Sequence, residues 1–220
     1  MRLSVLKSTA ASLAVPVFAG MLLAGCTTRA GELTAEGITA IRTACPTVAV
    51  PATTGDITLF DPPASVDQSG IDVSATLTKV RATCSDVGEN VSTLITFDVQ
   101  ARRTKGEGAR DVVLPYFVAV LQGGTVVLSK RVSRVALHFD DGQLRASTSG
   151  QATANVLRSA ATLPPDIRKL LTRPRKAGNE EAAVDPLARP NIRAAVQRAT
   201  FEALVGFQLT NDQLKYNATR

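Results

Sequence analysis

Alternation of apolar and polar residues dominates positions 48–209 of the chain, and its period is two. Successive side chains of a β-strand point to opposite faces, so this period is typical of strands with one buried face. Three long alternating runs stand out, at residues 71–84, 91–102 and 125–139. Short turn segments at 85–89 and 140–142 follow two of these runs, and another at 122–124 leads into the run at 125–139. The pattern therefore predicts antiparallel strands joined by tight turns.

Two irregularities refine the predicted strands. The apolar phase of the first run changes after Lys79, which predicts a bulge or bend near Thr78 and Lys79. Residues 112–121 are nearly all apolar, as in a central strand that is covered on both faces. Pro115 lies inside that run and has no N–H to donate, so we expect a bulge or a sheet edge at this point.

Residues 154–200 interrupt the alternation before it returns at 201–209. Pro164 and Pro165 precede a short helix-like stretch at 166–171, and residues 173–185 are polar. Pro190 can occupy the first turn of a second helix, which would span 191 to about 198. We expect a polar turn after the last strand. The sequence predicts a mainly β fold, an antiparallel β-sandwich of the immunoglobulin or fibronectin kind, with a helical basic insertion at 154–200 before the last strand.

The first 25 residues have the three zones of an export signal. Arg2 and Lys7 supply positive charge, residues 8–22 are uncharged and mostly apolar, and small residues follow. A membrane-spanning helix would need about 20 apolar residues. This run is shorter and contains Pro16, so the sequence favours a signal peptide at 1–25 over a spanning helix.

The next feature is Leu23-Ala24-Gly25-Cys26, which resembles the bacterial lipobox. That resemblance implies that the Cys26 thiol is acylated and that the chain is cut before it. Two acyl chains suffice for stable anchoring, so no hydrophobic helix would be needed. In the sorting rule that the resemblance implies, Thr27 in place of Asp favours the outer membrane. We expect a lipidated N-terminus and tether at 26–44 and one β-rich domain at 45–217, on the periplasmic face of the outer membrane.

Cys45 and Cys84 are the other cysteines. Disulfides persist in the periplasm, so we expect these two to pair. A disulfide between them would close a loop of about 40 residues, which would stabilise the fold by roughly 4 kcal/mol. Two free thiols are the alternative, but exposed thiols are a liability in an oxidising compartment. A zinc site is less favoured, because the two cysteines lie far apart and His138 is the only histidine. No metal or other cofactor is expected.

Positive charge is concentrated in the predicted insertion. Residues 158–200 contain nine basic and four acidic side chains, whereas the rest of the chain after Cys26 is nearly balanced. Such a cluster could contact anionic lipid at about 1 kcal/mol per charge, a cell-wall polymer or an envelope protein. The plain alternative is a solvated loop, and nucleic acid is not an expected partner in this compartment. The candidate contact residues are Arg168, Lys169, Arg173, Arg175 and Lys176.

Signs of catalysis are sparse. Any Ser-His-Asp device would have to use His138, which lies between Leu137 and Phe139 on an alternating run and should therefore face solvent. Asp140 and Asp141 precede Gly142, as turn residues commonly do. The chain also lacks a GxSxG elbow. We expect a module without enzymatic activity that binds or scaffolds another envelope component through sheet edges and the basic insertion, and the alternative is a hydrolase that acts on cell wall or lipid.

Several stretches together resemble a family of uncharacterised lipoproteins from Gram-negative bacteria. The resemblance covers about residues 45–153 and 201–217, and it implies a β-rich architecture and an envelope location without indicating a catalytic residue. The closing motif is its most specific part. The matching stretches are Cys45-Pro46, Cys84 at the end of the first long run, Tyr116-Phe117-Val118-Ala119-Val120, and Gly206-Phe207-Gln208-Leu209-Thr210-Asn211-Asp212-Gln213-Leu214-Lys215-Tyr216-Asn217.

Overall fold

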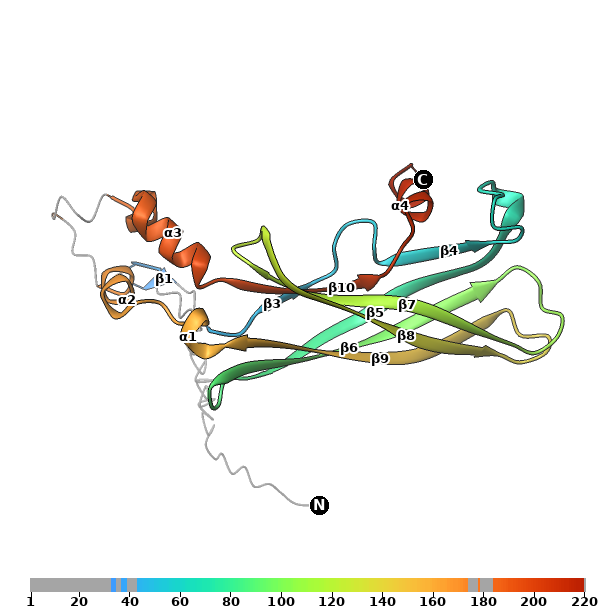
Figure 1. The fold of residues 1–220 in the computed structure, drawn as a ribbon, viewed down its shortest axis with the longest axis horizontal. Coiled ribbons are helices and arrows are strands. Elements are labelled where there is room, and N and C mark those ends of the chain that lie inside the picture. The colour runs from blue at the N-terminus through green and yellow to red at the C-terminus, as the bar shows by residue number, and fades with distance from the viewer. Residues whose placement is uncertain (1–32, 35–36, 39–42, 174–177, 179–183, 220) are drawn as a thin grey trace, which may run out of the picture.

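Two four-stranded sheets pack face to face in a computed structural model that describes residues 33–34, 37–38, 43–173, 178 and 184–219 (Figure 1). The first sheet consists, in order, of β3 (Thr47–Ala49), β10 (Phe201–Phe207), β7 (Arg110–Gln122) and β8 (Val126–Phe139). The second consists of β4 (Asp56–Phe60), β5 (Ile71–Ser85), β6 (Asn90–Arg103) and β9 (Arg145–Leu157). Within these sheets every neighbouring pair is antiparallel except β3 and β10. The predicted antiparallel β-sandwich is therefore confirmed.

The core lies between the inner faces of the two sheets, where alternate residues of β5, β6, β7 and β10 are buried together with the later parts of β8 and β9. Phe97 of β6 and Tyr116 of β7 meet there edge to face, with their ring centroids 5.0 Å apart. The Tyr116 hydroxyl donates to the carbonyl of Gln151, 2.7 Å away, so its polar end is satisfied inside the sandwich. Gly150 of β9 leaves room for this pair, because a Cβ at that position would lie 2.4 Å from the Phe97 ring.

We expect Gly150→Ala to lower the free energy of unfolding by about 1–3 kcal/mol, since the added methyl group would overpack the core against Phe97. Urea unfolding of the two proteins measures the difference. Ser147→Ala is the matched control, because Ser147 is an exposed residue of the same strand. Equal unfolding midpoints for Gly150→Ala and the wild type would contradict this account of the packing.

The predicted bulge in the first long strand is confirmed. The register between β5 and β6 shifts between Thr78 and Arg81, and Lys79 adopts a φ of 51°, in the left-handed region. The bulge reverses which face of the sheet the odd- and even-numbered side chains of β5 point to after Lys79, as the change in apolar phase predicted. Lys79 is also paired with Asp98 of β6, at 3.0 Å between Nζ and Oδ2.

Pro115 lies in the middle of β7 without disturbing its register with β8. Its carbonyl accepts a hydrogen bond from the N–H of Gln208, 2.9 Å away, and Gln208 comes directly after the end of β10. On this side β7 therefore has no strand neighbour at Pro115, which is why the missing N–H is tolerated. β7 has no bulge at Pro115; the proline lies where the pairing of β7 with β10 ends, while β8 still pairs with the other side of β7.

The insertion begins later than predicted. β9 continues to Leu157, and Ala154 and Val156 are buried in the core, so residues 154–157 belong to the sheet. The alternation continues through these four residues, with Ala154 and Val156 buried and Asn155 and Leu157 exposed. The helical part consists of α1 (Arg158–Ala161), α2 (Pro165–Leu171), the 3-10 turn η3 (Pro186–Ala188) and α3 (Pro190–Arg198). α2 and α3 confirm both predicted helices, and Pro190 opens α3 as expected.

The chain ends in a helix, α4 (Asn211–Thr219), where a polar turn was predicted, so that prediction was wrong. Thr210 and Gln213 form reciprocal hydrogen bonds: the Gln213 side chain accepts from the Thr210 N–H at 2.9 Å, and the Thr210 hydroxyl accepts from the Gln213 N–H at 3.2 Å. This is a capping box, and its Thr-x-x-Gln pattern is visible in the sequence. Asn217 fixes the helix to the sandwich by donating to the carbonyls of Thr53 and Asp56.

The segment expected to be a tether contains a short antiparallel pair, β1 (Leu33–Thr34) with β2 (Gly37–Ile38). A further 3-10 turn, η1 (Gln68–Gly70), precedes β5. Within the residues that the structure describes, no helix has both the length and the apolar character needed to cross a bilayer.

Candidate functional site

The structure joins Cys45 and Cys84 in a disulfide, with their Cα atoms 6.0 Å apart. Cys45 precedes β3 of the first sheet, and Cys84 lies near the end of β5 in the second. The bond therefore connects the two layers of the sandwich. This is the pairing that the sequence predicted, and its role is structural. Cys26, the predicted lipidation site, lies outside the described residues.

The basic cluster is only partly within the described residues. Arg168 and Lys169 occupy the last turn of α2, and Arg173 follows the helix; all three side chains are exposed. Helix α2 has no buried residues, so its basic side chains are part of an exposed helix of the insertion and not of the packed sandwich. Arg175 and Lys176 lie outside the described residues.

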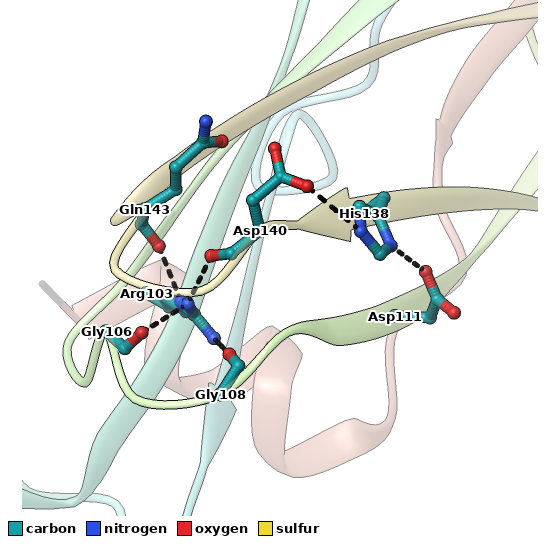
Figure 2. Close-up of polar contacts among 7 residues, drawn as sticks. All are labelled: Arg103, Gly106, Gly108, Asp111, His138, Asp140 and Gln143. Carbon is teal, nitrogen blue, oxygen red and sulfur yellow. Dashed lines mark hydrogen bonds and ion pairs between the residues drawn. The ribbon is translucent and has the colours of Figure 1, made fainter.

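Arg103, at the end of β6, organises one end of the sandwich (Figure 2). Its side chain is only 2% exposed. It stacks on the Phe139 ring, with the guanidinium carbon 5.2 Å from the centroid. Nε donates to the carbonyl of Gln143 at 2.7 Å, and Nη1 to that of Gly108 at 2.7 Å. Nη2 donates to the carbonyls of Gly106 and Asp140, at 2.6 and 2.9 Å.

All four of these acceptors are main-chain carbonyls, and they belong to the two loops that follow β6 and β8. Arg103 thus holds both loops through one buried guanidinium, whose fixed fork of five donors suits several acceptors at once. Asp141 reinforces the link, since its carboxylate accepts from the N–H of Gly108 at 2.7 Å. Sequence analysis missed Arg103. The available signal was its phase, because it continues the buried positions Val99 and Ala101 of β6.

His138 lies beside this end of the sandwich, on the outer face of β8, and its side chain is 58% exposed (Figure 2). The expectation that it faces solvent is confirmed. Nδ1 lies 2.6 Å from Oδ1 of Asp111, the residue opposite on β7, and Nε2 lies 3.3 Å from Oδ1 of Asp140. The hydrogen bond and the charge of Asp111 raise the pKa of His138 above its usual value of 6.5, and Asp140 adds a smaller contribution.

The geometry favours a charged imidazolium over a general base. A catalytic base needs one ring nitrogen directed at a nucleophile while the other is oriented by a carboxylate. Here both nitrogens of His138 face carboxylates, so both are best used as donors. Asp140 and Asp141 occupy the turn after β8, as predicted.

We expect Asp111→Asn to lower the pKa of His138 towards 6.5, and an NMR titration of the imidazole protons measures the change. Because the folded-state pKa is raised, the pair stabilises the fold fully below pH 6.5 while the carboxylates stay ionised. That contribution is lost as the pH rises through the raised pKa. Asp111→Asn should therefore shift the unfolding midpoint more at pH 6 than at pH 9. The same shift at both pH values would contradict the proposed ion pair.

The first two thirds of β8 form the most exposed strand segment of the sandwich, and the sequence did not single out these residues as a site. Every residue from 126 to 134 is exposed, although these residues lie within a strand. β8 is the last strand of its sheet, and no described strand pairs with its outer side. We name residues 126–134 the β8 edge. Its large apolar side chains are more than half exposed: Val126 (54%), Val127 (58%), Leu128 (52%) and Val132 (57%).

The sequence of the β8 edge departs from the alternation expected of a strand with one buried face. Residues 126–128 are three consecutive apolar residues, and residues 129–134 contain Lys130, Arg131 and Arg134 without any acidic side chain. A strand with one buried face would alternate instead. The segment combines unpaired main-chain groups, exposed apolar groups and positive charge, which is an arrangement suited to binding.

The described part of the chain holds no group of three His, Cys, Asp or Glu side chains placed to bind a metal ion. Its chemical features are therefore the disulfide, the guanidinium that holds the two loops, the exposed His138 pair, the basic cluster and the β8 edge. Comparison of the chain with protein-family models, with curated proteins and with solved structures gives no match.

Proposed function

We propose that this protein is a lipid-anchored module without enzymatic activity that binds or scaffolds another component of the bacterial envelope, on the periplasmic face of the outer membrane. The sequence of the first 27 residues supports the location: a charged start, an apolar stretch, the lipobox-like Leu23-Ala24-Gly25-Cys26 and then Thr27. The resemblance to lipoproteins of Gram-negative bacteria agrees with it. Lipid on Cys26 would hold the folded sandwich at the membrane surface.

The β8 edge is the observation that carries the binding role. Unpaired sheet edges are a liability, and proteins commonly keep them short or cover them. Here the unpaired edge is nine residues long and bears four large apolar side chains that are more than half exposed. Apolar groups that gather at a surface are typical of interaction sites. The basic cluster at Arg168, Lys169 and Arg173 supplies a second, charged surface that suits anionic lipid or a cell-wall polymer.

The anchor is tested by metabolic labelling with a fatty-acid probe. We expect the wild type to incorporate the probe and to fractionate with the outer membrane. Cys26→Ser should lose both the label and the membrane association. Thr27→Asp is the matched control, since it keeps the acylated cysteine and should move the protein to the inner membrane. An unlabelled wild type, or a Cys26→Ser protein processed and retained as before, would contradict the anchor.

The binding role is tested by cross-linking intact envelopes and isolating the protein with its partners. We expect a reproducible complex that His138→Ala leaves intact, because His138 lies outside the β8 edge and the basic cluster. The hydrolase alternative makes a different prediction. It requires turnover of a wall or lipid substrate that is abolished by His138→Ala, and that result would replace the binding module by an enzyme.

A further inference from the structure

The β8 edge directs main-chain hydrogen-bonding groups away from its sheet. Pro115 of β7 lies opposite Arg134 of β8, and the Pro115 carbonyl is turned the other way, towards Gln208. Residues directly opposite in an antiparallel pair turn their N–H and C=O groups either towards each other or both away. Arg134 therefore directs these groups to the free side. Since the register is unbroken here, Val132 and Lys130 do the same.

The length of the continuous free edge is set by a bulge. The β7–β8 register shifts between Val120 and Leu121, opposite Leu128. From Ser129 to Arg134 the pairing is regular, so six residues offer an uninterrupted strand edge. At about 3.3 Å per residue this edge is roughly 20 Å long. It can accept an extended segment of five to seven residues, which is the usual length of one strand, about five or six residues.

Basic and apolar side chains alternate along the outer face of the β8 edge, and this series favours a partner strand with acidic side chains. On the outer face, Lys130, Val132 and Arg134 give a basic, apolar, basic series. The ammonium group of Lys130 lies 4.8 Å from the centroid of the Phe117 ring, which places this charge on the sheet surface. Arg131, on the other face, is also exposed. A strand laid alongside would place its own outer side chains next to this series.

A second copy of the same strand is a poor occupant. Two β8 edges side by side would bring six basic side chains together without a single acidic one. Like charges on neighbouring strands are destabilising, so self-pairing is disfavoured. Basic residues on an edge also serve simply to prevent aggregation. That role alone leaves unexplained why the same segment exposes Val126, Val127, Leu128 and Val132.

We infer that the β8 edge binds an extended segment of a partner protein in which acidic and apolar residues alternate, and that this segment joins the sheet as an additional strand next to β8. Main-chain hydrogen bonds to Lys130, Val132 and Arg134 supply the affinity, and the basic side chains select acidic neighbours. The inference deepens the binding role proposed above and rests on it. It does not depend on the lipid anchor.

Two synthetic peptides test this inference on the chain that follows the signal. One peptide alternates Glu with Val over eight residues, and the other has Lys in place of every Glu. At saturation the Glu peptide should slow hydrogen exchange of the Lys130, Val132 and Arg134 amides at least about tenfold, since these groups become hydrogen-bonded. The Lys peptide should leave them unchanged. No slowing with the Glu peptide, or equal slowing with both peptides, would overturn the inference.

Substitutions test whether binding of the Glu peptide depends on the main-chain N–H groups of the β8 edge and on its basic side chains. Val132→Pro removes an N–H that points to the free side, so the β7–β8 pairing keeps its bonds while the added strand loses one. We expect it to weaken binding of the Glu peptide at least about tenfold, or 1.4 kcal/mol. Val132→Thr, which keeps the N–H, should bind as the wild type does. Unchanged binding by Val132→Pro would contradict strand addition.

A charge-reversed variant keeps the test valid if Val132→Pro does not fold. Lys130→Glu combined with Arg134→Glu should reverse the preference, so that the Lys peptide binds and slows exchange while the Glu peptide does not. An unreversed preference would overturn the inference.

Vesicles of phosphatidylglycerol test whether the β8 edge binds lipid instead of a protein segment. If they bind the same residues while the Glu peptide protects no amide, the edge is a lipid contact and strand addition is wrong.

The envelope cross-linking experiment separates this inference from the proposed function. If Val132→Pro and the charge-reversed variant both retain the wild-type complex, the β8 edge is not the binding site but the binding role stands. If the wild type forms no complex although the Glu peptide protects the edge amides, the proposed function is wrong and the binding capacity of the edge stands.

Discussion

Arg103→Met is expected to lower the free energy of unfolding by about 3 kcal/mol or more. The substitution keeps an apolar stem on Phe139 but removes every donor from four main-chain carbonyls, and each buried acceptor left without a partner costs about 1–3 kcal/mol. Water can reach some of the loop carbonyls, so the expected loss is smaller than the sum over all four. The effect should be greatest on the two loops that follow β6 and β8, whose amides should exchange faster.

Urea unfolding measures this loss, with two comparisons. Arg102→Met removes a basic side chain from the next position on the exposed face of the same strand, and it should change stability by less than about 0.5 kcal/mol. Arg103→Lys keeps the charge but has three donors on one nitrogen, so it should fall between the wild type and Arg103→Met. If Arg102→Met and Arg103→Met were equally stable, the buried guanidinium would not hold the loops.

Loss of the Cys45–Cys84 disulfide is expected to have a similar effect by a different route. Residues 45 and 84 are 39 positions apart. Without the bond the unfolded chain gains conformational entropy, which lowers the free energy of unfolding by roughly 4 kcal/mol in the chain-entropy model. The double variant Cys45→Ser, Cys84→Ser should therefore unfold at a clearly lower urea concentration. Reductant should lower the midpoint of the wild type to about the same value.

The control is the double serine variant treated with reductant, whose midpoint should not move. A wild-type midpoint insensitive to reductant would contradict the stabilising role of the bond. Cys84 pairs with Thr93 near one end of β6, whereas Arg103 lies at the other end, opposite Val73. The two sites share no partner, so the disulfide variant and Arg103→Met should lower stability additively.

Features that depend on neighbouring residues were predictable from the sequence. The bulge at Lys79, the turn at Gly142 and the start of α3 at Pro190 each follow from backbone preferences that act within a few residues. The strand positions follow from the period of two, which reports that one face is buried without reporting which strands are neighbours. The helix α4 could also have been predicted, since its capping box is local.

The candidate site was not predictable in the same way, because its parts come from distant segments. His138 and Asp111 are 27 positions apart, and Arg103 reaches the carbonyl of Gln143 across 40 positions. Register between strands brings each pair together, and no short sequence pattern encodes that register. The phase of Arg103 within β6 indicated burial, but its acceptors are main-chain carbonyls, whose position depends on how two loops fold over the end of the sandwich.

By itself, the amino-acid sequence determined most of the long strands, the turns between them and the helices α2 and α3, and it predicted the pairing of Cys45 with Cys84; it also predicts the lipid on Cys26, which lies outside the described residues. Only the tertiary structure decided which strand is left at the edge. β10 enters the sheet between β3 and β7, and β8 is consequently the last strand, with residues 126–134 exposed. The physical reason is that strand order depends on pairing over long sequence separations, whereas periodicity and turn chemistry act locally.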